Sequence, residues 1–354
     1  METPPGGGRI KTASPPTIKD VAAAARVSVT TVSHVLNDKG RIDPDTRARV
    51  KAIAHDLGYR PNRSAQSLRL GRTGTIGLLL PHLANVASRE LLNSDWYAGV
   101  SIAVARAAFA RDRALLLLPV DNDPARFLPL VDGVIAVDPM ERDPRLATLD
   151  KAGGAIVTLD FYDPSRRDFR YVLPDSRSGV RSLLEHLRDR GARQITAFYA
   201  KSDWAPLAHG LHVYRAWMAE QGLPERLEPV EIAAAPTIEA LHESAYHAAR
   251  ALLSSKDRPD AIIALFGGFG VDAARAARDL GLDCPGELMI AQDIDGTRER
   301  ITEPPITAID LRSDLQAAAA VDMLLSILDG EEPQEPVITP VDLNIRASTG
   351  RSRT

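Results

Sequence analysis

Apolar residues recur at helical spacing in three short stretches near the start of the chain. The first stretch follows Thr17 and the second follows Ser28, and both are residue types that cap helices. The third has Asp43 as its cap and Pro44 at its first position, and it stops at Gly58. The apolar faces consist of Ile18, Val21, Ala22 and Ala25, of Val32, Val35 and Leu36, and of Val50, Ile53, Ala54 and Leu57. The pattern predicts three short helices around a small core.

Beyond residue 73 the pattern changes to short apolar runs that alternate with amphipathic stretches. The runs are Thr75–Leu80, Ala114–Val120, Gly133–Val137, Ala155–Leu159, Ile195–Tyr199 and Ala261–Leu265. Continuous apolar runs of this length are typical of strands that are buried on both faces, and helices between them complete parallel α/β units. The sequence therefore predicts parallel sheets covered by helices.

Breaks in this alternation indicate two lobes. One break lies near residues 171–175, and the chain returns near residues 304–311, so we expect several crossovers. One lobe should comprise roughly residues 75–174 and a short return at 305–315. A long apolar helix is expected at residues 313–328, and it suits the core better than an interface.

The chain thus divides into four segments. Residues 1–16 are rich in Pro and Gly and contain almost no apolar material, which predicts a disordered tail. The helical domain spans 17–60, a linker follows at 61–72, and the two-lobed domain occupies 73–350.

Charge is distributed unevenly along the chain. Residues 17–72 contain 11 Lys and Arg against 5 Asp and Glu, a net charge of +6, and residues 1–16 add +1. Because the whole chain has a net charge of -4, the remainder carries -11. A basic helical module favours a polyanionic partner, although solvated surface charge is an alternative.

The composition limits the other function classes. Cys284 is the single cysteine, which excludes an intramolecular disulfide and a cysteine-rich metal cage. The chain has no apolar run of about 18 residues, and its start lacks the basic and apolar blocks of a secretion signal. We therefore expect a cytoplasmic protein with no membrane partner.

An enzyme is the main alternative, but its usual signatures are absent. His242, Glu243 and His247 look like a zinc-binding helix motif, yet the histidines are five residues apart, which turns them about 140° from each other. There is no G-x-S-x-G, Walker loop or G-x-G-x-x-G. We expect no enzyme activity, no cofactor and no metal.

The helical segment has a specific resemblance. The strings I-K-D-V-A-A-A-A-R-V-S-V-T-T-V-S-H-V-L-N and G-Y-R-P-N-R-S-A-Q-S-L-R closely resemble the DNA-binding head of LacI/GalR-family transcriptional regulators. The resemblance implies an all-α, lambda-repressor-like helix-turn-helix head whose second helix lies in the major groove. The partner would be double-stranded operator DNA, bound as a palindrome by a homodimer.

The resemblance also assigns DNA contacts. Val29, Thr30 and His34 match the base-reading positions, and His34 replaces the more usual Arg, so a two-bonded guanine contact becomes at most one hydrogen bond. Ser28, Thr31, Ser33 and Asn37 are further DNA-contact candidates. Lys19, Arg47, Arg49 and Arg63 are candidate phosphate contacts, and a solvated side chain is the alternative for each of them. Arg26 stands where the family usually has Gly, so this backbone must avoid a positive φ or bear strain.

The linker resembles the family's hinge helix, which enters the minor groove. Leu68 matches the leucine that wedges between base pairs and bends the duplex. A helix of about ten residues is marginal alone in water. We therefore expect it to order only on DNA beside a second subunit.

The body resembles the family's α/β two-lobed, type I periplasmic-binding-protein-like effector domain, with ligand between the lobes. Asp160 and Asp293 match effector-binding carboxylates at strand ends, and Trp96 and Tyr97 match aromatics that stack on ligand. Phe266 is assigned to the same site. Phe269 is expected to narrow it together with Phe266, and Leu207 stands where many members carry an effector-clamping Arg.

We interpret the chain as a sequence-specific transcription regulator, a repressor, controlled by a small-molecule effector. A transport binding protein would share the body fold, but the DNA-binding head and the missing secretion signal argue against it. The effector, a sugar or another small metabolite, stays open, and so does its action as inducer or corepressor. Activation in place of repression also stays open.

Overall fold

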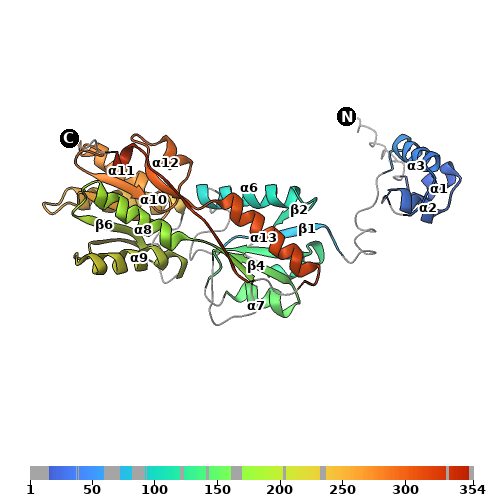
Figure 1. Cartoon of the computed structure of the whole chain (residues 1–354), viewed down its shortest axis with the longest axis horizontal. Helices are drawn as coiled ribbons and strands as arrows, with labels where there is room; N and C mark the ends of the chain where they lie inside the picture. Colours follow the sequence, from blue (N-terminus) through green and yellow to red (C-terminus); the bar gives the residue numbers. More distant parts are fainter. Residues whose placement is uncertain are drawn as a thin grey trace, which may run out of the picture. The chain divides into compact units, whose positions relative to one another are not determined.

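The computed structural model describes residues 16–36, 38, 40–59, 72–81, 92, 94–119, 123–140, 143–160, 170–201, 205–231, 237–331 and 335–350, with the backbone alone for 205–208. The chain separates into two compact units, Met1–Thr73 and Gly74–Thr354 (Figure 1). We call them the head and the body. Asn37, Arg63 and Leu68 lie outside the described residues.

The head contains the three predicted helices, α1 (Ile18–Ala25), α2 (Val29–Leu36) and α3 (Pro44–Asp56). Their predicted apolar faces meet in one core, in which Val21, Val32, Val35 and Val50 have no exposed surface. Such a core buries enough apolar area to hold three short helices that would be marginal in isolation.

The prediction that Leu57 is buried is wrong, because its side chain is 41% exposed. Helix α3 ends at Asp56, and the chain reverses at Gly58, where φ is +66°. The reversal lets the amide of Tyr59 donate to the carbonyl of Ala54, 2.9 Å away, and Tyr59 packs on the core instead.

The helix starts are capped at the predicted positions. The Ser28 hydroxyl accepts a hydrogen bond from the amide of Thr31 at 3.0 Å, and Asp43 accepts one from the amide of Thr46 at 3.0 Å. At α1 the Asp20 carboxylate accepts bonds from both the amide and the hydroxyl of Thr17, each at 2.7 Å. These bonds satisfy amides and a hydroxyl at the helix starts and fix where each helix begins.

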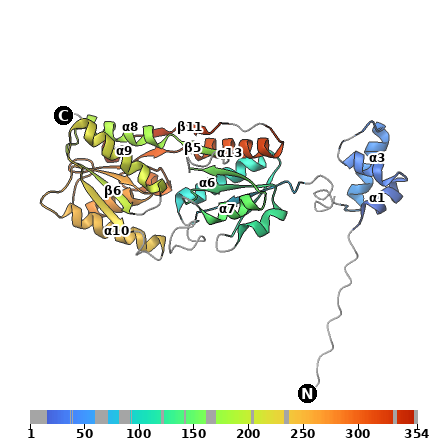
Figure 2. The same ribbon diagram turned by 90° about the horizontal axis from the view of Figure 1, so that it is seen from below.

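The first lobe of the body is a parallel six-stranded sheet in the order β11-β5-β4-β3-β1-β2. Its strands are β1 (Thr75–Leu79), β2 (Ala114–Leu117), β3 (Gly133–Val137), β4 (Ala155–Leu159), β5 (Arg170–Pro174) and β11 (Val337–Thr339). Its helices are α6 (Asp95–Phe109), η1 (Pro124–Leu130), α7 (Pro144–Lys151) and α13 (Ser313–Leu328). Helices α6 and α13 lie on one face of the sheet and α7 on the other (Figures 1 and 2).

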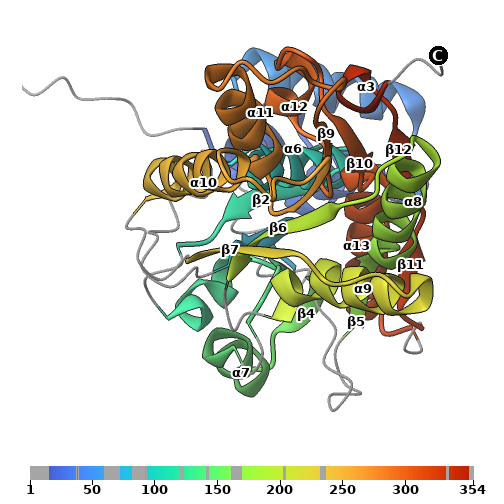
Figure 3. The ribbon, with the colours of Figure 1, turned by 90° about the vertical axis from the view of Figure 1, so that its left-hand side faces the viewer.

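The second lobe has a sheet in the order β12-β10-β9-β8-β6-β7, in which only β12 is antiparallel. Its strands are β6 (Ile195–Lys201), β7 (Leu227–Glu231), β8 (Ala261–Leu265), β9 (Met289–Gln292), β10 (Thr307–Asp310) and β12 (Asp342–Asn344). Its helices are α8 (Ser176–Asp189), α9 (Ala205–Gln221), α10 (Ile238–Leu253), α11 (Phe269–Asp279), α12 (Thr297–Ile301) and η3 (Ala347–Thr349). Helices α8 and α9 cover one face, and α10 and α11 cover the other (Figure 3).

All six predicted strand runs are strands, and the two-lobed arrangement is confirmed. The chain crosses between the lobes after β5, after β10 and after β11. The expected return at 305–315 is wrong, because β10 pairs with β9 and β12 in the second lobe. The return to the first lobe begins with α13. Buried parallel strands look alike in sequence, so the apolar run at β10 did not reveal its sheet.

Helix α13 is part of the core of the first lobe, as predicted, and it packs on β3, β4, β5 and α6. Its Met323 and Leu324 are almost fully buried. No helix among the described residues is long and apolar enough to cross a membrane.

Gly133, at the start of β3, leaves room for α13. A Cβ there would lie 2.7 Å from Cδ1 of Leu324 and 3.1 Å from the carbonyl oxygen of Ala155. We predict that Gly133→Ala lowers the free energy of unfolding by about 1–3 kcal/mol, because buried Leu324 has little space to move.

The matched control is Gly99→Ala in α6, where an added Cβ meets nothing within 4 Å. It should raise stability by about 0.5–1 kcal/mol, as Gly to Ala does inside a helix. Urea unfolding followed by tryptophan fluorescence reports the body, since all three tryptophans lie beyond residue 73. Equal stabilities of the two variants would contradict the packing argument.

Candidate DNA-reading helix and effector cavity

Helix α2 presents a polar face to solvent. Val32 and Val35 are completely buried, whereas Thr30 and His34 are exposed and the Val29 side chain is 41% exposed. Ser33 and Thr31 are half-buried, and Lys19 is exposed on α1. The structure thus gathers the predicted base-reading residues on one accessible face, next to the capped start of the helix.

Ser28, Thr31 and Arg47, all predicted DNA contacts, have partners within the head. The hydroxyls of Ser28 and Thr31 lie 2.8 Å apart within the cap of α2. Arg47 forms an ion pair with Asp38 at 2.8 Å, and Lys51 reaches the same carboxylate at 3.0 Å. These bonds hold the turn before α3. They also lower the pKa of Asp38, with the largest contribution from Lys51 and a smaller one from Arg47. Arg49, in contrast, is exposed on α3.

Arg26 adopts the left-handed conformation, with φ at +52°. The Arg26 amide donates to the carbonyl of Ala23 at 3.2 Å, and the Val27 amide donates to that of Ala22 at 3.1 Å. This is the hydrogen-bonding pattern that glycine usually provides at a helix end. Of the two expected alternatives, the backbone therefore bears the strain, which costs about 1–2 kcal/mol for a residue with a Cβ.

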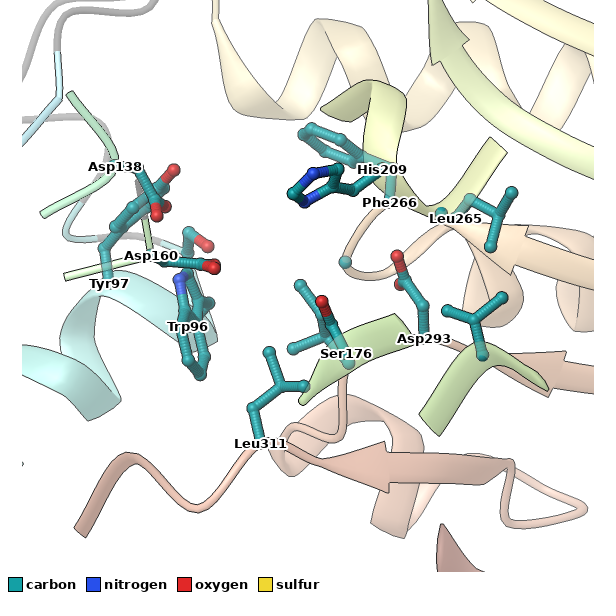
Figure 4. Close-up of a pocket in the computed structure, with 15 residues that line it drawn as sticks. Trp96, Tyr97, Asp138, Asp160, Ser176, His209, Leu265, Phe266, Asp293 and Leu311 are labelled. Atoms are coloured by element: carbon teal, nitrogen blue, oxygen red, sulfur yellow. The ribbon is translucent and has the colours of Figure 1, made fainter. Parts of the chain in front are cut away.

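A cavity lies between the two lobes of the body. About 100 Å³ of it is open to the centres of water molecules. Its lining consists of Ser94, Trp96, Tyr97, Asp138, Asp160, Ser176, Val180, His209, Gly210, Leu265, Phe266, Gly267, Asp293, Ile294 and Leu311. All five residues that the sequence assigned to the effector line this cavity (Figure 4).

The strand ends place the acidic residues. Asp138 follows β3, Asp160 follows β4 and Asp293 follows β9, so carboxyl groups from both sheets meet at the cavity. The carboxyl ends of parallel strands are where α/β proteins bind ligands. Asp138 and Asp160 have positive φ angles of 42° and 61°. Backbone strain of this kind concentrates at functional sites.

Burial changes the protonation of this acidic group. It raises the pKa of Asp138 and of Asp293 to about 7, against hydrogen bonds that lower both values. Burial, followed by the charge of Asp138, raises the pKa of Asp160 well above its usual range. Burial also raises the pKa of Tyr97, so its hydroxyl stays protonated and available as a donor.

A buried glutamine holds the second lobe's side of the cavity. The Nε2 of Gln292 donates to Oδ1 of Asp293 at 2.7 Å and to the carbonyl oxygen of Phe266 at 2.9 Å. Its Oε1 accepts a bond from the amide of Gly270 at 2.8 Å. Because these bonds orient Asp293 and Phe266 together, Gln292 fixes the geometry of two lining residues without lining the cavity itself.

Sequence reasoning missed Asp138, Ser176 and His209. Asp138 carried a usable signal, because it ends the strand G-V-I-A-V as Asp160 ends A-I-V-T-L. Phe269 was expected to narrow the cavity, but it is fully buried behind Phe266, with ring centroids 4.8 Å apart. The side chain of Leu207 lies outside the described residues.

The zinc-like motif has an ordinary structural role. The Nδ1 of His242 lies 2.7 Å from Oδ2 of Asp272, and Oδ1 of the same carboxylate accepts a bond from Arg298 at 3.5 Å. His247 is an exposed neighbour of Glu243. Within the described part of the chain, no group of three or more His, Cys, Asp and Glu residues is arranged to hold a metal ion.

Comparison with known proteins decides the family. A family model of bacterial regulatory proteins, lacI family, matches residues 17–62, and one of a periplasmic binding protein-like domain matches 184–349. The HTH-type transcriptional regulator CelR of Thermobifida fusca is 28% identical over 330 residues, which are 91% of this chain and 94% of CelR. The chain belongs to the LacI family of bacterial regulatory proteins.

Other relatives agree with this assignment. The ribose operon repressor of Escherichia coli (strain K12) is 27% identical over 87% of this LacI-family chain and 92% of its own length. A solved CelR–cellobiose complex is 26% identical, with a TM-score of 0.65 over 94% of this chain and 99% of the CelR chain. The lac repressor dimer bound to operator and the anti-inducer ONPF has a TM-score of 0.80 at 22% identity, over 95% and 99% of the two chains, and shows the same fold. These relatives are regulators, and the LacI-family chain is a DNA-binding transcription regulator rather than an enzyme.

The cavity acids predict how the stability of this LacI-family body depends on pH. Asp138 and Asp293 have folded pKa values of about 7, above their ordinary value of 3.8, so the folded state retains protons that the unfolded chain releases. This contribution to stability is complete below about pH 4 and is lost as the pH rises to about 7. We predict that Asp138→Asn and Asp293→Asn each reduce the loss of stability between pH 5 and pH 7.5.

The measurement is urea unfolding at both pH values, followed by tryptophan fluorescence. Glu185→Gln, which removes an exposed carboxylate paired with Arg181, serves as the control and should keep the parent's pH dependence. An unchanged pH dependence in both cavity variants would show that these acids ionise as freely as exposed ones.

Proposed function

We propose that this LacI-family chain represses transcription by binding a palindromic operator as a homodimer, and that a small molecule in the interlobe cavity controls its affinity for DNA. The observation that carries the proposal is the combination in one chain of an accessible α2 face with a cavity lined by strand-end carboxyls. Such a protein works in the cytoplasm, where its DNA lies.

The head recognises the operator sequence. Val29 packs on a thymine methyl group, Thr30 exchanges a hydrogen bond with a base edge, and His34 donates one to guanine. Lys19 and Arg49, both exposed, contact phosphates and contribute affinity without sequence information. Because one head reads only half a site, two heads are required, which favours an inverted repeat and a two-fold dimer.

The body controls the affinity of the head for DNA. Trp96, Asp138 and Asp160 reach the cavity from the first lobe, and Phe266 and Asp293 reach it from the second, so a bound molecule touches both lobes. The lobes also meet where the amide of Arg298 donates to Asp95 at 3.0 Å. A ligand that favours one arrangement of the lobes changes DNA affinity through a coupling of about 1–3 kcal/mol. The cellobiose in the CelR complex supports an effector of sugar size.

The direct test is selection of operator sequences from a pool of random duplex DNA by the purified full-length chain. We expect an inverted repeat, and a complex of two chains per duplex in sedimentation. Enrichment of a single half-site by a monomer would overturn the dimer, and enrichment of no sequence would overturn sequence-specific binding.

On the selected operator, His34→Ala should lose discrimination at one base pair per half-site by roughly 1–3 kcal/mol, with little change in binding to unrelated DNA. Arg49→Ala is the matched control. It should weaken binding to all sequences alike and reduce the salt dependence of binding. Equal losses on operator and unrelated DNA for His34→Ala would make His34 a phosphate contact instead of a base reader.

A further inference from the structure

The interlobe cavity has an unbalanced charge. Three carboxyl groups face it, from Asp138, Asp160 and Asp293, and no Lys or Arg is among its described lining residues. The one basic lining group is the imidazole of His209. Burial, followed by the nearby charge of Arg177, lowers the pKa of His209, so this ring is neutral near pH 7. The described part of the site therefore offers no cation to these acids.

Asp138 also lacks a partner for one of its oxygens. Its side chain is 96% buried, with 4% exposed, and Oδ1 has no hydrogen-bond partner among the described residues. In Figure 4 its carboxyl group and that of Asp160 lie side by side and face the space between the lobes. A buried acceptor without a donor costs about 1–3 kcal/mol, more when it is charged. Asp138 already has side-chain hydrogen bonds with Tyr97, Trp96 and Asp160, and a donor on a bound molecule would satisfy the remaining oxygen.

The walls beside the two acids are aromatic. Trp96 lies on the same side as Asp138 and Asp160, and Phe266 lies across the cavity (Figure 4). Aromatic faces pack on the C–H groups of a ring and also attract cations, especially where water is excluded. The cavity has about 100 Å³ of space for the centres of water molecules, and one water needs about 10–15 Å³ of it. The cavity therefore has room for on the order of seven to ten waters, which suits a sugar-sized molecule.

We propose that the effector is a small primary amine of about sugar size, whose ammonium group is shared by Asp138 and Asp160. The proposal rests on the proposed function, in which this cavity is the effector site. A hydroxyl has a single hydrogen to donate, whereas an ammonium has three donors and a positive charge, and it satisfies two neighbouring carboxylates at once. Asp293, already held by Gln292, is left for a second polar group of the amine.

The ionisation of the cavity agrees with this assignment. The titratable groups that face it are Asp138, Asp160, Asp293, Tyr97 and His209, and the charge of Glu299 acts on Asp293 from α12. Burial raises the pKa of all three acids, and the charges of Asp138 and Asp293 add to the rise at Asp160. An ammonium group removes that repulsion and stabilises the carboxylates, so amine binding should strengthen from pH 5.5 to pH 7.5.

The experiment measures the melting temperature of the full-length chain by tryptophan fluorescence at pH 7.5. The probes are glucosamine and galactosamine, each beside its hydroxyl parent and its N-acetyl derivative, with putrescine as an open-chain amine. We expect at least one amine to raise the melting temperature by several degrees, while its neutral counterparts have no effect. A neutral parent that stabilises as strongly as its amine, or no stabilisation by any amine, overturns the proposal.

Variants locate the binding group. Asp138→Asn and Asp160→Asn should each weaken binding of the stabilising amine at least tenfold, and both should raise the melting temperature of the free protein because a buried acid is removed. Glu185→Gln on the surface should change neither value. Unchanged amine affinity in both cavity variants would place the amine elsewhere and overturn the assignment.

Operator binding separates this proposal from the proposed function. A neutral sugar that stabilises the body and alters operator affinity would overturn the amine and leave an effector-controlled regulator intact. An amine that binds in the cavity without altering operator affinity would support the ligand chemistry and contradict effector control.

Discussion

The body depends on one electrostatic constraint, the removal of several carboxyl groups from water at the junction of its lobes. Parallel strands end at a common edge, and two sheets facing each other bring Asp138, Asp160 and Asp293 to the same cavity. Buried acids of this kind oppose folding unless they are protonated or paired. The fold tolerates them because the two sheets and their helices bury large apolar cores on both sides of the junction. The cavity thus contains acids whose negative charge costs stability.

The head solves a different problem with local interactions. Its helices are short, so their ends matter as much as their cores. Caps at Ser28 and Asp43 fix the helix starts, and the ion pairs of Asp38 hold the turn before α3. Val29, Thr30 and His34 on the outer face of α2 stay exposed, whereas the hydroxyls of Ser28 and Thr31 serve the cap. A rigid small scaffold with an exposed polar face is suited to contacting the edges of bases.

The sequence predicts this molecule best where local chemistry decides the outcome. Buried parallel strands are continuous apolar runs, and capping residues mark helix starts, so these elements follow from short windows of sequence. The lobe to which β10 belongs depends on long-range pairing, which no window contains. Tyr59 packs on the core in place of Leu57 because a left-handed turn at Gly58 redirects the chain. Gln292 acts through bonds to its neighbour Asp293, to Phe266 after β8 and to Gly270 at the start of α11, and an isolated glutamine gives no sign of that.

The three crossovers affect how the polypeptide is made. The first lobe begins directly after the head, yet its helix α13 and its edge strand β11 come from residues 313–339, after nearly all of the second lobe has been synthesised. On the ribosome, the first lobe therefore remains without one helix and one edge strand while most of the chain emerges. Pairing β11 with β5 joins segments more than 160 residues apart, which is a slow, non-local step. A prematurely terminated chain would carry a complete head on an incomplete first lobe. Folding of the first lobe therefore depends on synthesis of residues 313–339, which form α13 and β11.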